Sequence, residues 1–281
     1  ALLSELIAPK IAPNMQPPII IQIHILMYFN CFTYSIYLLL LIVNTVRKII
    51  CNFATMAKVV AIILAAGSGT RCKTQLPKQY VYVAGRPVVM WSIDAFRNAI
   101  SGIETILVIN PDTKKLWEEL CVKHGFESPR LVSGGSTRWE SVKNAISTIT
   151  ADDDTIVLVH DGARPAVDAE TICGVVETAA KCDGAIPVVP VTDSLRVLNT
   201  DGTSEAVDRS LYRVVQTPQG FKLDKLLRAY NAPYRTEFTD DASVMEYAGY
   251  KDLRLTTGSP DNIKLTFAAD IQAIENILKN R

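Results

Sequence analysis

The chain has 281 residues, and its 29 lysines and arginines balance 29 aspartates and glutamates. This length allows one large domain or two small ones. A formal net charge of zero gives no excess of positive charge for a polyanion, so we expect no nucleic-acid partner. The six cysteines form no C-x-x-C pair and have no histidine at zinc spacing, which indicates free thiols and a cytoplasmic location.

The first 55 residues differ in composition from the rest of the chain. Residues 19–43 are almost wholly apolar and are followed by Arg47 and Lys48, so this segment is long enough to span a bilayer. Polar residues interrupt the run, however, and Met56 stands just before the first strand of a self-sufficient domain. Two interpretations stay open, a membrane anchor or a translated upstream extension. We therefore divide the chain into an extension at 1–55 and a domain at 56–281.

An apolar, β-branched run at 59–63 predicts a buried parallel strand that leads into a tight loop. Four loop residues have little or no side chain, which lets a ligand approach the backbone N–H groups: Ala65, Ala66, Gly67 and Gly69. Arg71 and Lys78 add two cations. The loop lacks the Gly-Lys-Ser/Thr of a P-loop and the third glycine of a dinucleotide fingerprint. A polyphosphate is the ligand that this combination favours.

Strand-like and helix-like segments alternate from Met56 onward. Strands are expected at 59–63, 105–110, 131–132, 155–159, 184–191, 212–215 and 253–256. Helices are expected at 88–98, after 111, after 135, at 169–181, 222–230 and 240–247, and around 271–278. This alternation predicts an α/β protein with a mostly parallel sheet and helices on both faces, which is a three-layer α/β/α arrangement.

One segment breaks the alternation. Residues 193–209 read as two extended stretches around a turn at 199–202, and the Asp201-Gly202 pair favours a hairpin. The stretches are too polar for a core strand pair, so we expect a β-arm that projects from the domain.

Two further clusters follow predicted strands. In Ser133-Gly134-Gly135-Ser136-Thr137-Arg138, with Ser141 beyond, the hydroxyls and amides stand at a helix N-terminus, where they either meet an anion or base edge or simply cap the helix through Ser136 or Thr137. In His160-Asp161-Gly162-Ala163-Arg164-Pro165, Asp161 is placed to bind Mg²⁺ beside phosphates. The alternatives there are an ion pair with Arg164 and a structural role for His160. Similarly, Thr239 either contacts substrate or caps the next helix.

Taken in order, these segments resemble the 2-C-methyl-D-erythritol 4-phosphate cytidylyltransferases of the non-mevalonate isoprenoid pathway. The motifs that carry the resemblance are A-A-G-S-G-T-R at 65–71, P-K-Q-Y at 77–80, G-G-S-T-R at 134–138, H-D-G-A-R-P at 160–165, V-D-R-S at 207–210, Q-T-P-Q at 216–219, T-D-D-A-S at 239–243 and N-I-K-L-T at 262–266. The resemblance covers about 57–281 and leaves out the first 55 residues.

The resemblance implies a Rossmann-like nucleotidyltransferase fold and transfer of CMP from CTP to the sugar-alcohol phosphate, with Mg²⁺ bound by Asp161. It implies catalytic roles for Arg71, Lys78 and Lys264. It implies nucleotide binding by Ala65, Ala66, Gly67, Gly69, Gly134, Gly135, Arg138, Ser141 and Asp161. It implies binding of the acceptor by Arg164, Ser194, Arg209, Thr217, Thr239 and Thr266. It also implies a homodimer in which the arm, with Arg209, reaches the neighbouring subunit.

Two other functions stay open. Ribitol 5-phosphate cytidylyltransferases share the scaffold and most of the motifs, and Gly162 matches neither group, so that position does not discriminate. A membrane-tethered, non-catalytic nucleotide-binding protein on the same scaffold is the second alternative, although the intact set of cations argues against it.

Overall fold

The computed structural model describes residues 57–67, 76–150 and 154–281. The extension predicted at 1–55 lies outside the described residues, and so do Gly69 and Arg71 of the first glycine loop. Within the described ranges, no helix is both long enough and apolar enough to cross a bilayer.

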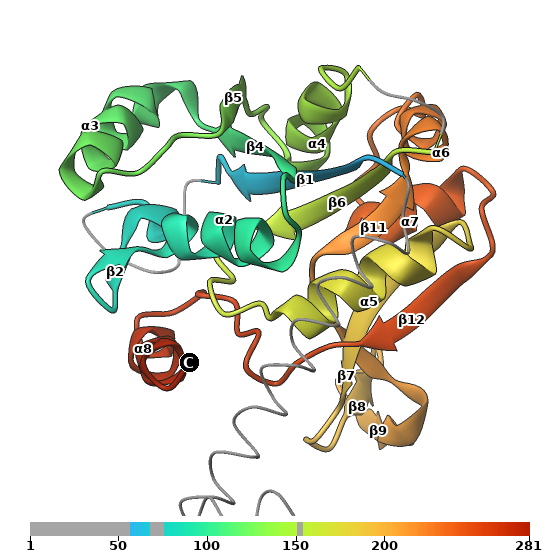
Figure 1. Cartoon of the computed structure of the whole chain (residues 1–281). Coiled ribbons are helices and arrows are strands. Elements are labelled where there is room, and N and C mark those ends of the chain that lie inside the picture. Colours follow the sequence, from blue (N-terminus) through green and yellow to red (C-terminus); the bar gives the residue numbers. More distant parts are fainter. Residues whose placement is uncertain (1–56, 68–75, 151–153) are drawn as a thin grey trace, which may run out of the picture. The chain divides into compact units, whose positions relative to one another are not determined.

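An eight-stranded sheet runs through the domain (Figure 1). One half is parallel and contains, in spatial order, β6 (Ile156–Asp161), β1 (Val59–Ala65), β4 (Glu104–Ile109) and β5 (Arg130–Ser133). The other half contains β7 (Gly184–Pro190), β12 (Leu253–Thr257) parallel to it, and two antiparallel strands, β10 (Arg213–Val215) and β11 (Gln219–Lys222). β11 joins the halves because it pairs with both β6 and β7. The predicted mostly parallel sheet is confirmed, but β11 was not predicted.

The alternation of side chains along β1 produces the layers. Val59, Ala61, Ile63 and Ala65 belong to one core cluster and Val60 and Ile62 to the other, because successive strand residues point to opposite faces. The first cluster includes residues of α2 (Val88–Ala99), α3 (Lys114–His124) and α5 (Ala169–Ala179). The second includes residues of α4 (Arg138–Ile146), α6 (Leu223–Ala229) and α7 (Asp241–Tyr247). The α/β/α arrangement is therefore confirmed.

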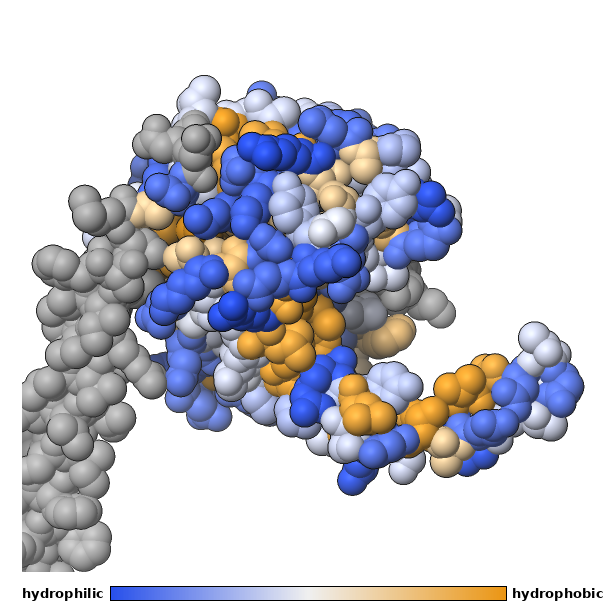
Figure 2. Space-filling view, turned by 90° about the vertical axis from the view of Figure 1, so that its right-hand side faces the viewer, coloured by the Kyte–Doolittle hydropathy of each residue, from blue (hydrophilic) through white to orange (hydrophobic). Residues whose placement is uncertain are grey.

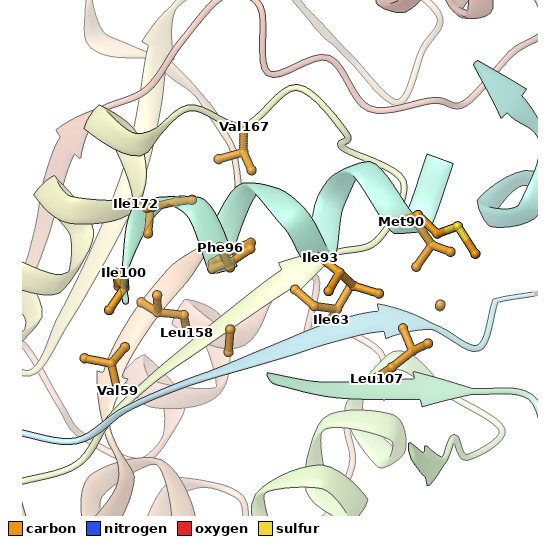
Figure 3. Close-up of a cluster of buried hydrophobic side chains, with 14 of the residues drawn as sticks. Val59, Ile63, Met90, Ile93, Phe96, Ile100, Leu107, Leu158, Val167 and Ile172 are labelled. Carbon is orange, nitrogen blue, oxygen red and sulfur yellow. The ribbon is translucent and has the colours of Figure 1, made fainter. Parts of the chain in front are cut away.

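The first cluster attaches α2 to the centre of the sheet. Figure 3 shows Ile93 and Phe96 of α2 pointing toward Ile63 of β1 and Leu158 of β6. All four side chains have no exposed surface. Fully burying one aliphatic or aromatic side chain contributes roughly 1.5–3 kcal/mol, so these four side chains help to hold the helix over the two central strands.

Several short elements complete the domain: η2 (Lys78–Tyr80), β2 (Tyr82–Val83), β3 (Arg86–Pro87), η3 (Pro111–Thr113), η4 (Arg209–Leu211) and α8 (Asp270–Lys279). The β2–β3 hairpin was not predicted. It packs with α8 in a third cluster that includes Val83, Leu265 and Ile274.

The predicted arm is present as β8 (Arg196–Leu198) and β9 (Ser204–Ala206). Gly202 closes its turn with φ +84°, a left-handed conformation that glycine adopts without strain. Figures 1 and 2 show the arm projecting from the domain, with apolar residues along it. Val197 and Leu198 on the arm are 50% and 80% exposed.

Candidate active site

The candidate site is the edge of the sheet where the parallel strands β1, β4, β5 and β6 end. Parallel strands bring their carboxyl ends to one edge, and ligands of open α/β sheets bind there. Three of the segments predicted to contact ligand, 65–67, 133–138 and 160–165, begin at these strand ends.

The first and second glycine loops meet at this edge. The Gly134 N–H donates to the Ile109 carbonyl at 2.8 Å, which fixes the second loop against the end of β4. A Cβ at Gly134 would lie 2.3 Å from Ala66 Cβ, so only glycine permits this approach. Ser141 Oγ accepts from the Gly135 N–H at 3.1 Å. The structure thus brings together Ala66, Gly134, Gly135 and Ser141, four of the residues predicted to bind the nucleotide.

Capping also occurs in the second loop. Thr137 is the N-cap of α4, and its side chain accepts from the Glu140 N–H at 3.0 Å. Ser136 does not cap the helix; its N–H and hydroxyl both donate to Glu140 Oε2 at 2.6 Å. The capping interpretation is therefore confirmed for Thr137 alone. The N–H groups of Gly134 and Gly135 already donate to the Ile109 carbonyl and to Ser141 Oγ, so these glycines supply space beside Ala66 rather than free donors.

Gln79 connects the Lys78 segment to the first glycine loop. Its Nε2 donates to the carbonyls of Ala65 at 2.6 Å and Gly67 at 2.9 Å, and only 2% of the residue is exposed. These bonds hold η2, and with it Lys78, beside the loop. Gln79 belongs to the P-K-Q-Y motif at 77–80, but no role was predicted for it from the sequence. An amide next to a predicted phosphate-binding lysine was the only available signal.

Three cations surround Asp161 at the end of β6. Lys264 Nζ lies 2.8 Å from Asp161 Oδ2, Arg164 Nε lies 3.4 Å from the same oxygen, and Arg138 Nε lies 3.8 Å from Oδ1. The predicted Asp161–Arg164 ion pair is therefore present, and residues from three separate motifs converge on one carboxylate. Burial alone would raise the pKa of Asp161, but the three cations lower it well below its usual range, so the carboxylate stays ionised.

His160 is buried and has the structural role that was one of the alternatives for the 160–165 motif. Its Nε2 donates to the Arg164 carbonyl at 3.1 Å, and the Thr217 hydroxyl donates to its Nδ1 at 3.1 Å. The Thr217 oxygen in turn accepts from the Asp161 N–H at 3.1 Å. Burial lowers the pKa of His160 to about 4, against a smaller opposing effect of Asp161. The neutral imidazole thus holds the Asp161–Arg164 turn against Thr217.

Arg138 makes its strongest contacts away from Asp161. Both of its terminal nitrogens donate to Asp241, at 2.9 and 2.6 Å, and the Tyr230 hydroxyl donates to the same carboxylate at 2.6 Å. Burial alone would lower the pKa of Arg138, but Asp241 raises it above its usual value. From the sequence alone, Asp241 was not predicted to belong to the site.

Four other residues were predicted to bind the acceptor. Ser194 and Thr239 are exposed, Thr266 is half-buried, and Arg209 donates to the Thr192 carbonyl at the base of the arm. Thr239 does not cap α7: the N-cap is Asp240, which accepts from the Ser243 N–H at 2.9 Å. The capping interpretation of Thr239 is therefore wrong. Gly69 and Arg71 lie outside the described residues.

Small residues and clustered cations at the carboxyl edge of a parallel sheet suit the binding of phosphate groups. The fold and this site together are those of an α/β protein whose site suits phosphate-bearing ligands.

Comparison with known proteins narrows this class. A sequence model of the 2-C-methyl-D-erythritol 4-phosphate cytidylyltransferase family, IspD, matches residues 59–280. The enzyme of that name from Porphyromonas gingivalis is 42% identical over 219 residues, which cover 78% of this chain and 96% of the relative. The crystal structure of 4-diphosphocytidyl-2C-methyl-D-erythritol synthase from Anaerococcus prevotii has a TM-score of 0.68 at 26% identity and covers 79% of this chain and 96% of its own. The Thermus thermophilus cytidylyltransferase has a TM-score of 0.60 at 28% identity, over 78% of this chain and 98% of its own.

The chain belongs to the 2-C-methyl-D-erythritol 4-phosphate cytidylyltransferase family. It is thus a nucleotidyltransferase of isoprenoid precursor biosynthesis.

Proposed function

We propose that the chain transfers CMP from CTP to 2-C-methyl-D-erythritol 4-phosphate. An oxygen of the acceptor phosphate forms a bond to the α-phosphorus of CTP, the bond from that phosphorus to the bridging oxygen breaks, and pyrophosphate leaves with the electron pair. Such a reaction needs in-line positioning and compensation of negative charge rather than covalent help from the protein.

The convergence of Arg138, Arg164 and Lys264 on Asp161 is the observation that carries the proposal. Three cations against the carboxylates of Asp161 and Asp241 leave the cluster with net positive charge at the end of β6. In our assignment Lys264 contacts the α-phosphate or the attacking phosphate, and Lys78 holds the triphosphate together with Arg71. Ala65, Ala66, Gly67, Gly134, Gly135 and Ser141 receive the cytidine.

The residues present fit a single Mg²⁺ held mainly by phosphates. Among the described residues, no group of three or more His, Cys, Asp or Glu side chains is arranged to hold a metal ion. Asp161 offers one ionised carboxylate, and Mg²⁺ at phosphate sites needs only one or two, with water and phosphate oxygens completing the shell. We therefore assign Asp161 as the protein ligand. The ion would neutralise charge on the leaving pyrophosphate.

Pyrophosphate release by the full chain tests the proposal, with CTP, Mg²⁺ and either methylerythritol phosphate or ribitol 5-phosphate as acceptor. We expect turnover with methylerythritol phosphate alone. Lys78→Ala and Arg71→Ala should lower kcat by orders of magnitude while the fold persists. Turnover only with ribitol 5-phosphate would keep the fold and the site but move the substrate to the polyol alternative, and no turnover with either would contradict an enzymatic role.

The arm supports a further proposal, that two copies of the chain assemble and that Arg209 completes the partner's acceptor site. Apolar side chains on and just after the arm are exposed in the single chain: Val197, Leu198, Leu211, Tyr212, Val214 and Val215. A folded monomer seldom exposes so many neighbouring apolar residues without a partner. Sedimentation of the full chain should give a dimer, and Leu198→Asp with Leu211→Asp should yield monomers with reduced turnover; a wild-type monomer with full turnover would contradict assembly.

We also propose that the catalytic domain begins near Met56, since the family match starts at residue 59. Cys121 and Cys182 are free thiols, which supports a reducing, cytoplasmic location. Amino-terminal sequencing of the native protein and fractionation would test both points, and a product that starts before residue 56 and sediments with membranes would contradict them.

A further inference from the structure

Two buried amides fasten the segment that carries Lys264. This segment, 258–266, follows β12 and has no regular structure until α8. Gln216, which is 5% exposed, contacts both backbone groups of Ser259: its Nε2 donates to the carbonyl at 2.8 Å and its Oε1 accepts from the N–H at 3.1 Å. A Cβ at Gly258 would lie 2.5 Å from Gln216 Oε1, so the glycine makes room for this contact.

The second amide belongs to Asn262, which has no exposed surface. Its Nδ2 donates to the Thr217 carbonyl at 2.8 Å, and its own carbonyl accepts from Arg164 Nη1 at 2.9 Å. Asn262 thus joins the Lys264 segment to two residues that flank Asp161. The Thr217 hydroxyl binds the Asp161 N–H, and Arg164 binds the Asp161 carboxylate.

Lys264 depends on this attachment because its own side chain is 37% exposed and long. The ammonium group of a lysine rotates freely on a flexible stem, so its position is set by the backbone that carries it and by its ion partner. Two residues after Asn262 that backbone places Lys264 Nζ 2.8 Å from Asp161. One residue further on, the Leu265 N–H donates to the Ala163 carbonyl at 2.8 Å and closes the segment.

We propose that Asn262 is a positioning residue for the reaction: its side-chain amide ties the Lys264 segment to Thr217 and thereby keeps the Lys264 ammonium group on Asp161. The inference rests on the proposed function, because it acts through Lys264.

The hydrogen bonds of Asn262 also support a positioning role. Within the described part of the chain, Asn262 Oδ1 is buried and has no hydrogen-bond partner. The side chain therefore makes its hydrogen bonds through the Nδ2 donor. Its Nδ2 bond to the Thr217 carbonyl and the bond from Arg164 to its backbone carbonyl lead to the residues around Asp161, while a longer bond from Nδ2 to Gln216 Oε1, at 3.4 Å, joins the two amides.

A labelling experiment tests the placement of Lys264 without any assay of turnover. The full chain and its Asn262→Ala variant are exposed to limiting acetic anhydride, and acetylation of each lysine is followed by mass spectrometry. We expect Lys264 to react at least threefold faster in the variant. Lys225, whose Nζ lies 2.6 Å from Asp183, is the internal control and should react at an unchanged rate. An unchanged rate at Lys264, or an equal rise at both lysines, would overturn the proposal.

A double-mutant cycle tests the consequence for catalysis. Asn262→Ala should lower kcat by about 10- to 100-fold and change the KM for CTP by less than threefold. The same substitution should have less than a twofold effect on kcat in a Lys264→Ala background, but its full effect in a Lys78→Ala background. Additive losses in both backgrounds would overturn the positioning role.

Two controls separate the possible failures. If Asn262→Ala does not fold, as judged by its thermal unfolding, both experiments are repeated with Asn262→Asp, which keeps the size of the side chain and removes the donor. If wild-type protein releases no pyrophosphate with either acceptor, the proposed function fails, while the labelling result still decides whether Asn262 positions Lys264.

Discussion

Arg138 and Asp241 are 103 residues apart in the chain and form a two-bond ion pair in which the Asp241 side chain has no exposed surface. The pair connects the start of α4, which follows the second glycine loop, to the start of α7 on the same face of the sheet. Tyr230, the C-cap residue of α6, also donates its hydroxyl to Asp241. One carboxylate therefore holds three helix ends together beside the candidate site.

Replacing Asp241 by Asn should destabilise the domain strongly. Arg138 would stay partly buried with no carboxylate at its terminal nitrogens, and breaking one partner of a buried ion pair costs about 3–5 kcal/mol. Urea unfolding measures the loss. Asp252→Asn is the matched control, since it breaks the Arg254–Asp252 pair, in which both side chains are about half exposed; exposed pairs contribute little. Equal losses of unfolding free energy in the two variants would show that Asp241 stabilises the domain no more than an exposed ion-pair partner does.

Gly134→Ala should abolish CTP binding while Gly174→Ala should leave it intact. The new methyl group at 134 would lie 2.3 Å from Ala66 Cβ, which forces the two glycine loops apart. At Gly174, within α5, a Cβ meets nothing within 4 Å. Alanine there should stabilise the helix by roughly 0.5–1 kcal/mol, because glycine loses more backbone entropy. Calorimetric titration with CTP and thermal unfolding measure the two effects. Unimpaired binding by Gly134→Ala would contradict the role given to the loop contact.

Gln79→Ala should weaken CTP binding by about 10- to 100-fold. The substitution removes two hydrogen bonds that hold the Lys78 segment on the first glycine loop, each worth about 0.5–1.5 kcal/mol. Titration of CTP in the presence of Mg²⁺ gives the ratio of Kd values. Gln272→Ala, which removes an exposed bond to Asn276 on α8, should bind CTP like the wild type. Matching affinities for all three proteins would exclude Gln79 from the site.

Buried His160 should make the domain less stable in mild acid. Its pKa is lowered to about 4 in the folded chain, while an unfolded chain has a value near 6.5. Between these values the unfolded chain binds a proton that the folded chain does not, so stability falls as the pH falls from 6.5 to 4. The shift corresponds to about 3 kcal/mol in total. Urea midpoints across this range should fall less steeply for His160→Gln than for the wild type, and parallel curves would contradict the assignment.

The fold was largely predictable because its long elements have strong patterns. The strands β1, β4 and β6 are apolar runs, and the helices α2, α4 and α5 each have one apolar face. Packing the apolar helix faces against the sheet buries both. β11 escaped prediction because Gln219-Gly220-Phe221-Lys222 is short and has one large apolar residue. Its position depends on the gap between β6 and β7, where a Cβ at Gly220 would lie 2.6 Å from Val175 Cγ1. The β2–β3 hairpin, with two residues in each strand, likewise depends on tertiary packing.

The candidate site likewise has one part that was predictable from the sequence and one part that was not. Its glycine loops and Asp161 could be found because their residue types and their places after strands are local features. Asp241, Gln79 and Asn262 could not be assigned, since each acts on a residue that only the folded chain brings near. Asp241 in particular reads as an ordinary first-turn carboxylate until Arg138 and Tyr230 are seen around it.

The place of β11 constrains how the protein is made on the ribosome. β11 lies between β6 and β7 but is synthesised after both of them and after the whole arm. A nascent chain that has not passed residue 222 therefore has the two neighbours without the strand that joins them. During this interval the edge of β6 offers unpaired backbone groups, which is the kind of edge that chaperones must shield from other chains. A break anywhere in the arm consequently separates the amino-terminal fragment from the strand that completes its own sheet.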